Sequence, residues 1–396
     1  MRSRGPIALP SSDREVQVMI VSTNIGIGTF CGGFSMSGLS VAKFLAPKRS
    51  ASHRFMPFVL CGILVSLPIV STPIVSAQQW SADRAPKTLT VATWNLEWFF
   101  DDETQNNRSS VAKEQSAPSR EEWDWRVAMF ASAIADFEPT ILAVQEIEDR
   151  ACMQALTKVL KDRHDLSYRV AFIDGYDSGT EQDVAILFRS GLVEFSRREQ
   201  NYSMFNSKEF YNLSKHLIAR FEWQAGDRTI PLTLMVMHLR ATADAAELRS
   251  KQARLAHEWM RRQIASGENV IILGDLNVEE PAGAILPDGD GMHLLLGKGT
   301  PETNDDLIDL LERSPADARR THLILDKQFD RILASSSLVQ GSGGYRFEKI
   351  EVLSQHNIRG AGPDADHWET RYTKDRKERD LSDHHPVMAT LELVQP

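Results

Sequence analysis

The feature that most constrains the fold is a recurring unit in which a short apolar run ends directly in polar, chemically active residues. Short apolar runs of this kind indicate buried β-strands. A buried strand carries charge only at its rim, because desolvating an unpaired carboxylate is costly. Several such strands side by side would therefore bring their terminal side chains to one cluster. Six runs end in this way, in chain order at Asn95 and Glu97, Gln145 and Glu146, His238, Asp275 and Asn277, Asp330, and Asp383 and His384.

Helical patterns alternate with these runs. Ser119 followed by Glu122 forms a capping box, and apolar residues then recur at helical spacing up to Phe137. Similar spacing predicts a second helix around Leu156 and a long amphipathic helix around Leu255. Interleaved helices and strands indicate an α/β fold. We expect strands near residues 88–93, 141–144, 168–173, 184–188, 231–237, 270–273, 331–333 and 387–393.

The N-terminal part has the character of a targeting segment. Residues 55–75 carry no charge, Lys48, Arg49 and Arg54 precede them, and small residues lead up to Ala77. This pattern predicts a secretory signal cleaved after Ala77. The alternative is a retained membrane anchor, since the run is about long enough to span a bilayer.

These observations predict the organisation of the chain. We expect residues 1–77 to be an N-terminal extension and signal, residues 78–87 a linker, and residues 88–396 a single domain. The protein is then secreted or periplasmic, or membrane-anchored if the signal is uncleaved.

Charge and cysteine content exclude some classes of protein. The 396 residues carry a net charge of -9, and residues 1–77 hold seven Lys/Arg and two Asp/Glu, so that 38 basic and 52 acidic residues remain. This balance disfavours tight, charge-driven binding of nucleic acid, although it leaves room for an enzyme whose bound cation faces the phosphate. The three cysteines form no CxxC pair, which excludes zinc-ribbon and redox motifs.

The polar residues at the strand ends form a ligand set rich in hard oxygen atoms. Carboxylates and amides without a Cys/His tetrad suit Mg²⁺ or Mn²⁺ rather than structural zinc. Each motif alone also has an ordinary explanation, because a Gly-Asp after a strand is often a turn and a Gln-Glu pair is often solvated. The occurrence of all six motifs in one order favours the functional interpretation.

Six motifs carry a resemblance to a known family. WNLEW, QEIE, MHLRA, GDLN, FDRIL and LSDHHP resemble the ordered signature of the endonuclease/exonuclease/phosphatase superfamily of metal-dependent phosphoesterases, over Leu89 to Leu393. The resemblance implies a four-layer α/β sandwich, in which two packed, mixed β-sheets are flanked by helices. It also places the active site at one end of the sandwich.

The resemblance also implies a metal site. Glu146 would be the principal ligand of Mg²⁺ (or Mn²⁺), with Asn95 beside it. Glu97 stands where some relatives have an acidic ligand, and Asp383 would complete the site from the far end of the chain. The cation would contact a non-bridging phosphate oxygen as a Lewis acid.

The catalytic residues follow from the same resemblance. His384 is expected to be the general base, and Asp330 would fix its tautomer. Asp275 and Asn277 would position the water and the phosphate, while His238 would donate to a phosphoryl oxygen or assist the leaving group. The sequence leaves open whether Asp275 or His384 takes the proton, and we favour His384 because an imidazole is better matched to neutral pH.

Two further residues are candidates for substrate binding. Tyr176 falls where the family often places a phosphate-contacting tyrosine, and the alternative is a plain loop tyrosine. Arg240 follows His238 where many relatives have lysine, so that substrate contact and a solvated side chain are both open. His385 is expected only to shape the turn.

The substrate is expected to be nucleic acid. The WNLEWFF opening is similar to that of secreted bacterial nucleases, and two loops are locally basic, around residues 197–220 and 371–379. The main alternative is a lipid phosphoesterase, which would need an exposed aromatic loop such as residues 202–211 to reach a bilayer. A non-catalytic binding module is a remote third possibility. The sequence implies no protein partner, and we expect a monomer.

Overall fold

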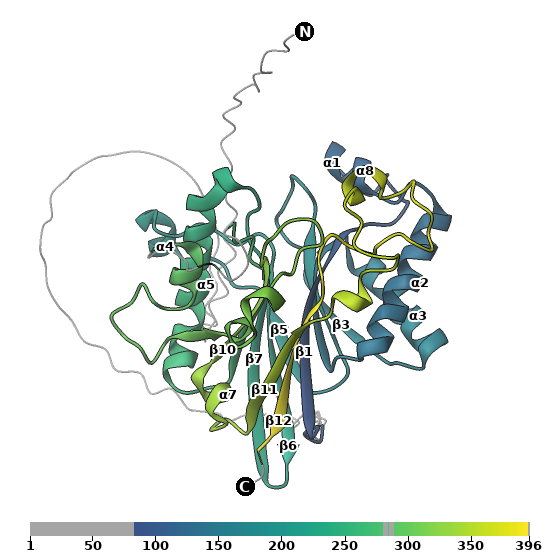
Figure 1. Ribbon diagram of the computed structural model, residues 1–396. Helices are drawn as coiled ribbons and strands as arrows, with labels where there is room; N and C mark the ends of the chain where they lie inside the picture. The colour runs from purple at the N-terminus through teal and green to yellow at the C-terminus, as the bar shows by residue number, and fades with distance from the viewer. Residues whose placement is uncertain (1–82, 280–283, 285–288, 395–396) are drawn as a thin grey trace, which may run out of the picture. The chain divides into compact units, whose positions relative to one another are not determined.

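Figure 1 shows the computed structural model, which describes residues 83–279, 284 and 289–394. All of these residues belong to a single compact unit. The predicted signal over residues 1–77, and residues 78–82 of the predicted linker, lie outside the described residues, so the expected domain boundaries stay predictions. In the described part of the chain, no helix combines the length and apolar character needed to cross a bilayer.

The first sheet is organised around a central parallel pair. β1 (Thr88–Phe99) lies parallel to β2 (Ile141–Ile147), whereas the other neighbouring strands of this sheet are antiparallel. Within the described residues this sheet has six strands, in the order β11 (Tyr345–Val352), β12 (Val387–Leu393), β1, β2, β4 (Asp183–Phe188) and β3 (Arg169–Phe172).

The second sheet repeats this plan. β7 (Arg228–His238) lies parallel to β8 (Val270–Asp275) at the centre, and antiparallel strands flank the pair. Its six strands, counted over the same described residues, have the order β5 (Leu192–Ser196), β6 (His216–Ala225), β7, β8, β10 (Asp330–Ser335) and β9 (Leu307–Asp309).

The sheets pack face to face and helices cover their outer faces (Figure 1). One apolar cluster lies between the sheets, and two others lie between a sheet and its helices. α2 (Arg120–Phe137) and α3 (Arg150–His164) cover the first sheet, while α5 (Ala246–Ala265) and α6 (Gly291–Leu295) cover the second. This arrangement confirms the predicted four-layer α/β sandwich. Shorter helices are α1 (Ser110–Gln115), α4 (Tyr202–Ser207), α7 (Ser336–Gln340) and α8 (His367–Thr370), with 3-10 turns at Ala243–Ala245, Leu310–Arg313, Ala316–Ala318 and Ser354–His356.

The start of α2 follows the predicted cap only in part. The Ser119 hydroxyl accepts a hydrogen bond from the Glu122 amide at 3.3 Å, as an N-cap residue does. The Glu122 carboxylate does not complete the box, because it accepts hydrogen bonds from Arg376 and Arg379. The helix start is therefore tied to the loop that precedes β12.

Central strands end in unusual backbone conformations. Glu97, Glu146 and Asn277 have φ values of 48°, 58° and 49°, in the left-handed region that side-chain-bearing residues rarely occupy. The pairing of β1 and β2 shifts register between Asn95 and Phe99, as a β-bulge does. Bulges and positive φ values redirect the side chains at these strand ends, and such strain is typical of functional sites.

Gly274, which precedes Asp275 in β8, is required by its surroundings. Its φ is 137°, and a Cβ atom there would lie 1.9 Å from the Met237 carbonyl oxygen of the paired strand β7. Only glycine allows this close approach of the two strands.

We therefore expect Gly274→Ala to lower the free energy of unfolding by at least about 2 kcal/mol, measured by urea denaturation. Gly226→Ala is the matched control. Its φ is 64° and no atom lies within 4 Å of the added Cβ, so only the conformational cost of about 1 kcal/mol applies. Equal losses in the two variants would contradict this account of the close approach.

Candidate active site

Asn95, in β1, joins the two sheets at one end of the sandwich. Its amide nitrogen donates to Asp275 Oδ2 at 2.9 Å and to Glu146 Oε1 at 3.1 Å. Its amide oxygen accepts a hydrogen bond from the Glu97 backbone N–H at 2.9 Å, which fixes the orientation of the amide. The ends of β1, β2 and β8 therefore meet at a single side chain.

His238 closes this group from the end of β7. Its Nε2 atom lies 3.5 Å from Asp275 Oδ2 and 3.9 Å from Glu146 Oε1. Burial lowers the pKa of His238 to about 3, and Lys215 contributes to the shift. The ring is therefore neutral, and it can donate a hydrogen bond without carrying charge.

His384 and Asp330 form a buried pair. His384 Nδ1 lies 2.7 Å from Asp330 Oδ2, while Nε2 lies 3.7 Å from Asp275 Oδ2 and 3.9 Å from Asp383 Oδ1. Burial alone would lower the pKa of His384, but the carboxylates of Asp330 and Asp275 outweigh burial and raise it well above the usual value. One ring nitrogen is thus fixed by a carboxylate and the other faces the cluster.

Glu97 lies in the site, and its carboxylate has strong partners. His367 Nε2 lies 2.6 Å from Oε2, which also accepts a hydrogen bond from the Asp383 backbone N–H at 3.0 Å, and Arg371 lies 3.4 Å from Oε1. Burial alone would raise the pKa of Glu97, but Arg371 and His367 lower it to about 2. In this structure Glu97 holds α8 and the Asp383 backbone, and its predicted role as a metal ligand stays a prediction.

His322 and Trp368 flank Asp383. Trp368 Nε1 donates to Asp383 Oδ2 at 2.9 Å, and His322 Nε2 lies 3.9 Å from the same oxygen. His322 Nδ1 accepts hydrogen bonds from the backbone N–H groups of Ile324 and Leu325, both at 3.0 Å. A neutral imidazole with an accepting Nδ1 carries its proton on Nε2. His322 therefore presents an N–H to the site.

Three buried carboxylates make the cluster suitable for a cation. Asp275 and Asp383 lie near His384 Nε2, Glu146 lies near His238 Nε2, and the side chains of Glu146, Asp275 and Asp383 are 15%, 2% and 15% exposed. Burial, followed by the charge of Asp383, raises the pKa of Glu146 to about 7. A cation would relieve this repulsion, because opposite charge stabilises an ionised carboxylate.

The donor atoms also have a suitable arrangement. One group of possible ligands consists of Glu146, His238 and Asp275, and a second consists of Asp383 with His322 and His384. Within each group the ligand atoms lie within 4.8 Å of one another. Carboxylate and amide oxygens suit a hard divalent cation. The residues present therefore fit a divalent metal.

The remaining predicted residues have different surroundings. Asn277 donates its backbone N–H to Asp275 Oδ1 at 2.9 Å and its side-chain amide to the Leu239 carbonyl at 3.0 Å, so it supports the turn that carries Asp275. Tyr176 is 65% exposed and packs against the Arg197 guanidinium, 4.6 Å from the ring centre. The Arg240 side chain is exposed. The substrate-binding roles of Tyr176 and Arg240 stay predictions.

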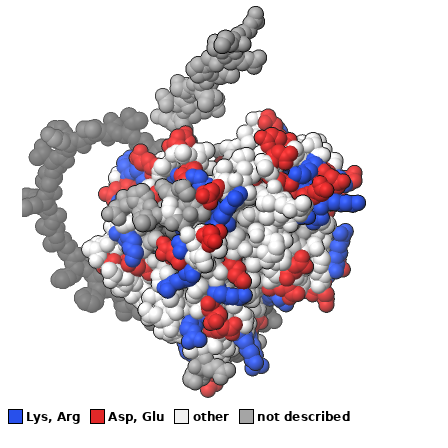
Figure 2. Space-filling view, in the orientation of Figure 1, with Lys and Arg blue, Asp and Glu red and all other residues white. Residues whose placement is uncertain are grey.

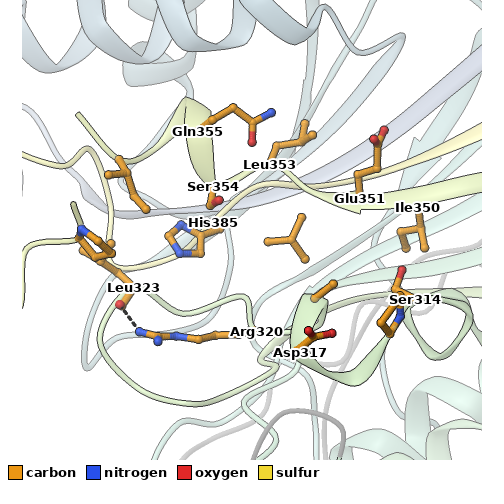
Figure 3. Close-up of a pocket in the computed structure, with 15 residues that line it drawn as sticks. Ser314, Asp317, Arg320, Leu323, Ile350, Glu351, Leu353, Ser354, Gln355 and His385 are labelled. Atoms are coloured by element: carbon orange, nitrogen blue, oxygen red, sulfur yellow. Dashed lines mark hydrogen bonds between the residues drawn. The ribbon is translucent and has the colours of Figure 1, made fainter. Parts of the chain in front are cut away.

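His385 faces away from its neighbour His384. Its Nδ1 atom lies 3.0 Å from the Asn357 side-chain nitrogen, and its ring borders a cavity of about 620 Å³ (Figure 3). Arg320, on the opposite wall, directs its guanidinium to backbone carbonyls, including that of Leu323. This cavity lies behind the segment that carries His384, so the reacting groups described above do not line it.

Sequence reasoning missed several residues that complete the site. His322, His367 and Trp368 follow no apolar run, and that pattern was the signal used to find candidates. Lys215 and Arg371 belong to the two locally basic loops, and the sequence does not distinguish them from the other basic residues there. Lys215 is buried between Asp177 at 3.1 Å and Gln182 at 2.9 Å.

Comparisons with known proteins agree with this geometry. Residues 92–384 match the model of the endonuclease/exonuclease/phosphatase family. No curated protein sequence matches the chain.

The chain is similar to solved structures from several organisms. Humanized D. rerio TDP2 is 18% identical, with a TM-score of 0.49, and the match covers 78% of this chain and 100% of that one. A Bacteroides thetaiotaomicron protein of the endonuclease/exonuclease/phosphatase family is 16% identical, with coverages of 78% and 100% and a TM-score of 0.48. The human Nocturnin catalytic domain is 14% identical, with coverages of 78% and 96% and a TM-score of 0.48.

The family match includes the ends of the central strands from both sheets, where acidic, amide and imidazole groups meet in one cluster suited to a divalent metal. The chain therefore belongs to the endonuclease/exonuclease/phosphatase family and is a phosphoric ester hydrolase.

Proposed function

We propose that this hydrolase is a secreted, divalent-metal-dependent phosphodiesterase that cleaves DNA or RNA. The catalytic part of this proposal rests on the pair of His384 and Asp330, in which Nδ1 and Oδ2 lie 2.7 Å apart. The second ring nitrogen of His384, Nε2, faces the carboxylates of Asp275 and Asp383. Secretion is proposed from the N-terminal segment, and the mature enzyme would then meet nucleic acid outside the cell.

His384 takes a proton from the attacking water in this proposal. Its Nδ1–H donates to Asp330, so the ring presents the Nε2 lone pair to the site once Nε2 has lost its proton, a loss that a cation held by the nearby carboxylates would favour. Asp330 then stabilises the imidazolium that forms. Asp275 is the weaker candidate for the base, because it already accepts hydrogen bonds from Asn95 and from the Asn277 backbone.

Other residues orient and stabilise the phosphate. His238 is neutral and buried, and it donates a hydrogen bond to a phosphoryl oxygen or to the leaving group. Asn277 keeps Asp275 in place through its backbone N–H. These groups are held by strand ends, so they are positioned before the substrate binds.

Glu146 and Asp383 would hold Mg²⁺ or Mn²⁺, with Asn95 and Glu97 in support. A bound cation of this kind supplies Lewis-acid stabilisation of charge that develops on the phosphate. Burial, followed by the charge of Asp383, raises the pKa of Glu146 to about 7, and a bound cation would favour its ionised form.

The surface charge indicates how a nucleic acid would be held. Basic side chains of the two loops have acidic partners, for example Arg376 with Glu122, Lys374 with Asp364 and Arg220 with Glu222. On the face shown in Figure 2, positive and negative side chains are interspersed. Binding would therefore depend on the site itself more than on a basic surface.

A lipid phosphoesterase is the second candidate, because an aromatic group is exposed around α4. Tyr202, Phe205 and Tyr211 are exposed, and Lys208 lies over the Phe205 ring at 4.4 Å. Met204 and Phe210 instead pack against the core. α4 and α8 lie on opposite sides of the sandwich in Figure 1, so this aromatic group is separate from the Trp368 side of the active site.

A substrate panel tests the choice between these two candidates. With Mg²⁺, Mn²⁺ or Ca²⁺ supplied in turn, we expect cleavage of plasmid DNA or RNA, and little release of phosphate groups from sphingomyelin or phosphoinositides. Because the basic loops are internally paired, nuclease turnover should fall only modestly as the salt concentration rises. The slope of log turnover against log salt concentration should correspond to about one or two neutralised phosphates. Turnover confined to lipids would overturn the nuclease proposal.

Metal binding can be measured without activity. Mg²⁺ or Mn²⁺ at about 100 times its Kd should add about 2.7 kcal/mol to the stability of the folded protein, seen as a rise in Tm that EDTA reverses. Glu146→Gln should abolish most of this rise, because it removes a ligand charge while keeping the side-chain volume. Glu138→Gln, at the exposed C-terminal end of α2, is the matched control and should respond like wild type. A full metal response in Glu146→Gln would contradict the proposed ligand set.

The general base is tested by two substitutions assayed on a bis-aryl phosphodiester with Mg²⁺. We expect His384→Ala to lower kcat by about 10²- to 10⁴-fold, the usual contribution of a positioned acid–base residue. Asp330→Asn should lower kcat in the same direction, because an amide no longer favours the required tautomer or the imidazolium. His164→Ala, on α3, is the control. Folded variants of His384 and Asp330 that both keep wild-type turnover would show that the mechanism is wrong.

A further inference from the structure

Trp368 is a large aromatic side chain exposed beside the active site. Trp368 lies in α8, and the residue is 52% exposed. Its indole N–H donates to Asp383 Oδ2 at 2.9 Å. The other oxygen of Asp383 is 3.9 Å from His384 Nε2, the nitrogen assigned above to the proton transfer. A single carboxylate therefore separates this exposed ring from the reacting centre.

Trp368 ends a chain of aromatic rings along one side of the site. Phe329 contacts His384 with ring centres 5.7 Å apart, His384 contacts His322 at 5.1 Å, and His322 contacts Trp368 at 5.6 Å. The first three residues are buried and Trp368 is the outermost. This aromatic wall therefore leads from the buried base to solvent.

The ring is held in place by its neighbours. His367, the preceding residue, contacts Glu97 Oε2 at 2.6 Å, and Arg371, just after α8, contacts Glu97 Oε1 at 3.4 Å. His322 packs edge-on against the indole, with an interplanar angle of 71°. A ring held in this way loses little conformational freedom when a ligand stacks on it, and this lowers the cost of binding.

We propose that Trp368 is a stacking platform for an unpaired nucleobase next to the scissile phosphate. The inference rests on the proposed nuclease function and specifies its substrate as single-stranded nucleic acid, because in a duplex the faces of a base are covered by its neighbours. Stacking on an aromatic side chain recognises any base, since every base has a π-face. It also needs no basic surface, in agreement with the paired Arg and Lys side chains of the loops.

The test separates stacking from an effect of Trp368 through Asp383. The substrates are a single-stranded tetrathymidylate and its analogue in which hydrogen replaces all four bases, so that both have the same backbone and charge. Trp368→Leu should lower kcat/KM on the tetrathymidylate about 5- to 100-fold more than on the abasic analogue. Trp368→Phe keeps a ring but loses the N–H donor, and it should retain most of the preference for the base-bearing substrate. Tyr202→Leu, which removes an 81% exposed aromatic ring on α4, is the matched control and should leave the preference unchanged.

Each outcome has a clear meaning. Equal losses on both substrates in folded Trp368→Leu, checked by circular dichroism, would mean that Trp368 acts only through Asp383 and would overturn the inference alone. Wild-type enzyme that cleaves plasmid DNA or RNA but neither of these substrates would overturn the inference alone, whereas failure on every nucleic acid would overturn the proposed nuclease function and this inference with it. A loss in Trp368→Leu seen only on sphingomyelin vesicles would assign the ring to a membrane and would also overturn the inference.

Discussion

Negative charge buried at one end of the sandwich determines which side chains must surround the active site. Carboxylates that lose water need a compensating partner. Glu97 has His367 and Arg371, and Asp330 has His384. The other acidic side chains of the cluster, Glu146, Asp275 and Asp383, contact an amide, imidazoles, an indole and backbone N–H groups, and none of them forms an ion pair with Arg or Lys among the described residues. A divalent cation would complete this compensation, and metal binding would then stabilise the site.

The sandwich supplies this arrangement because each sheet has a parallel pair at its centre. The ends of β1 and β2 in one sheet and of β7 and β8 in the other reach the same end of the core, where Asn95 and His238 contact Asp275 and Glu146. Bulged and left-handed backbone at these ends turns the side chains toward one another. The interior between the sheets stays apolar, and the polar chemistry is confined to its rim.

The sequence predicted the central strands and the long helices α2, α3 and α5, but it did not mark the edge strands β5 and β11. Apolar runs such as residues 141–144 and 270–273 mark β2 and β8, because a strand buried on both faces has an unbroken apolar pattern. β5 and β11 mix polar and apolar residues at the sheet edges, so they have no comparable signal. Trp368 and His322 contribute from loops whose positions depend on tertiary contacts with Asp383 and Glu97. The local sequence around Trp368 and His322 therefore has no pattern that predicts those contacts.

The most direct test of the central claim is a crystal of the protein grown with Mn²⁺ and measured at a wavelength where manganese scatters anomalously. The account predicts an anomalous peak among the carboxylate oxygens of Glu146, Asp383 and the neighbouring Asp275. A fully occupied manganese peak elsewhere, with these three side chains bound only to protein or water, would contradict it.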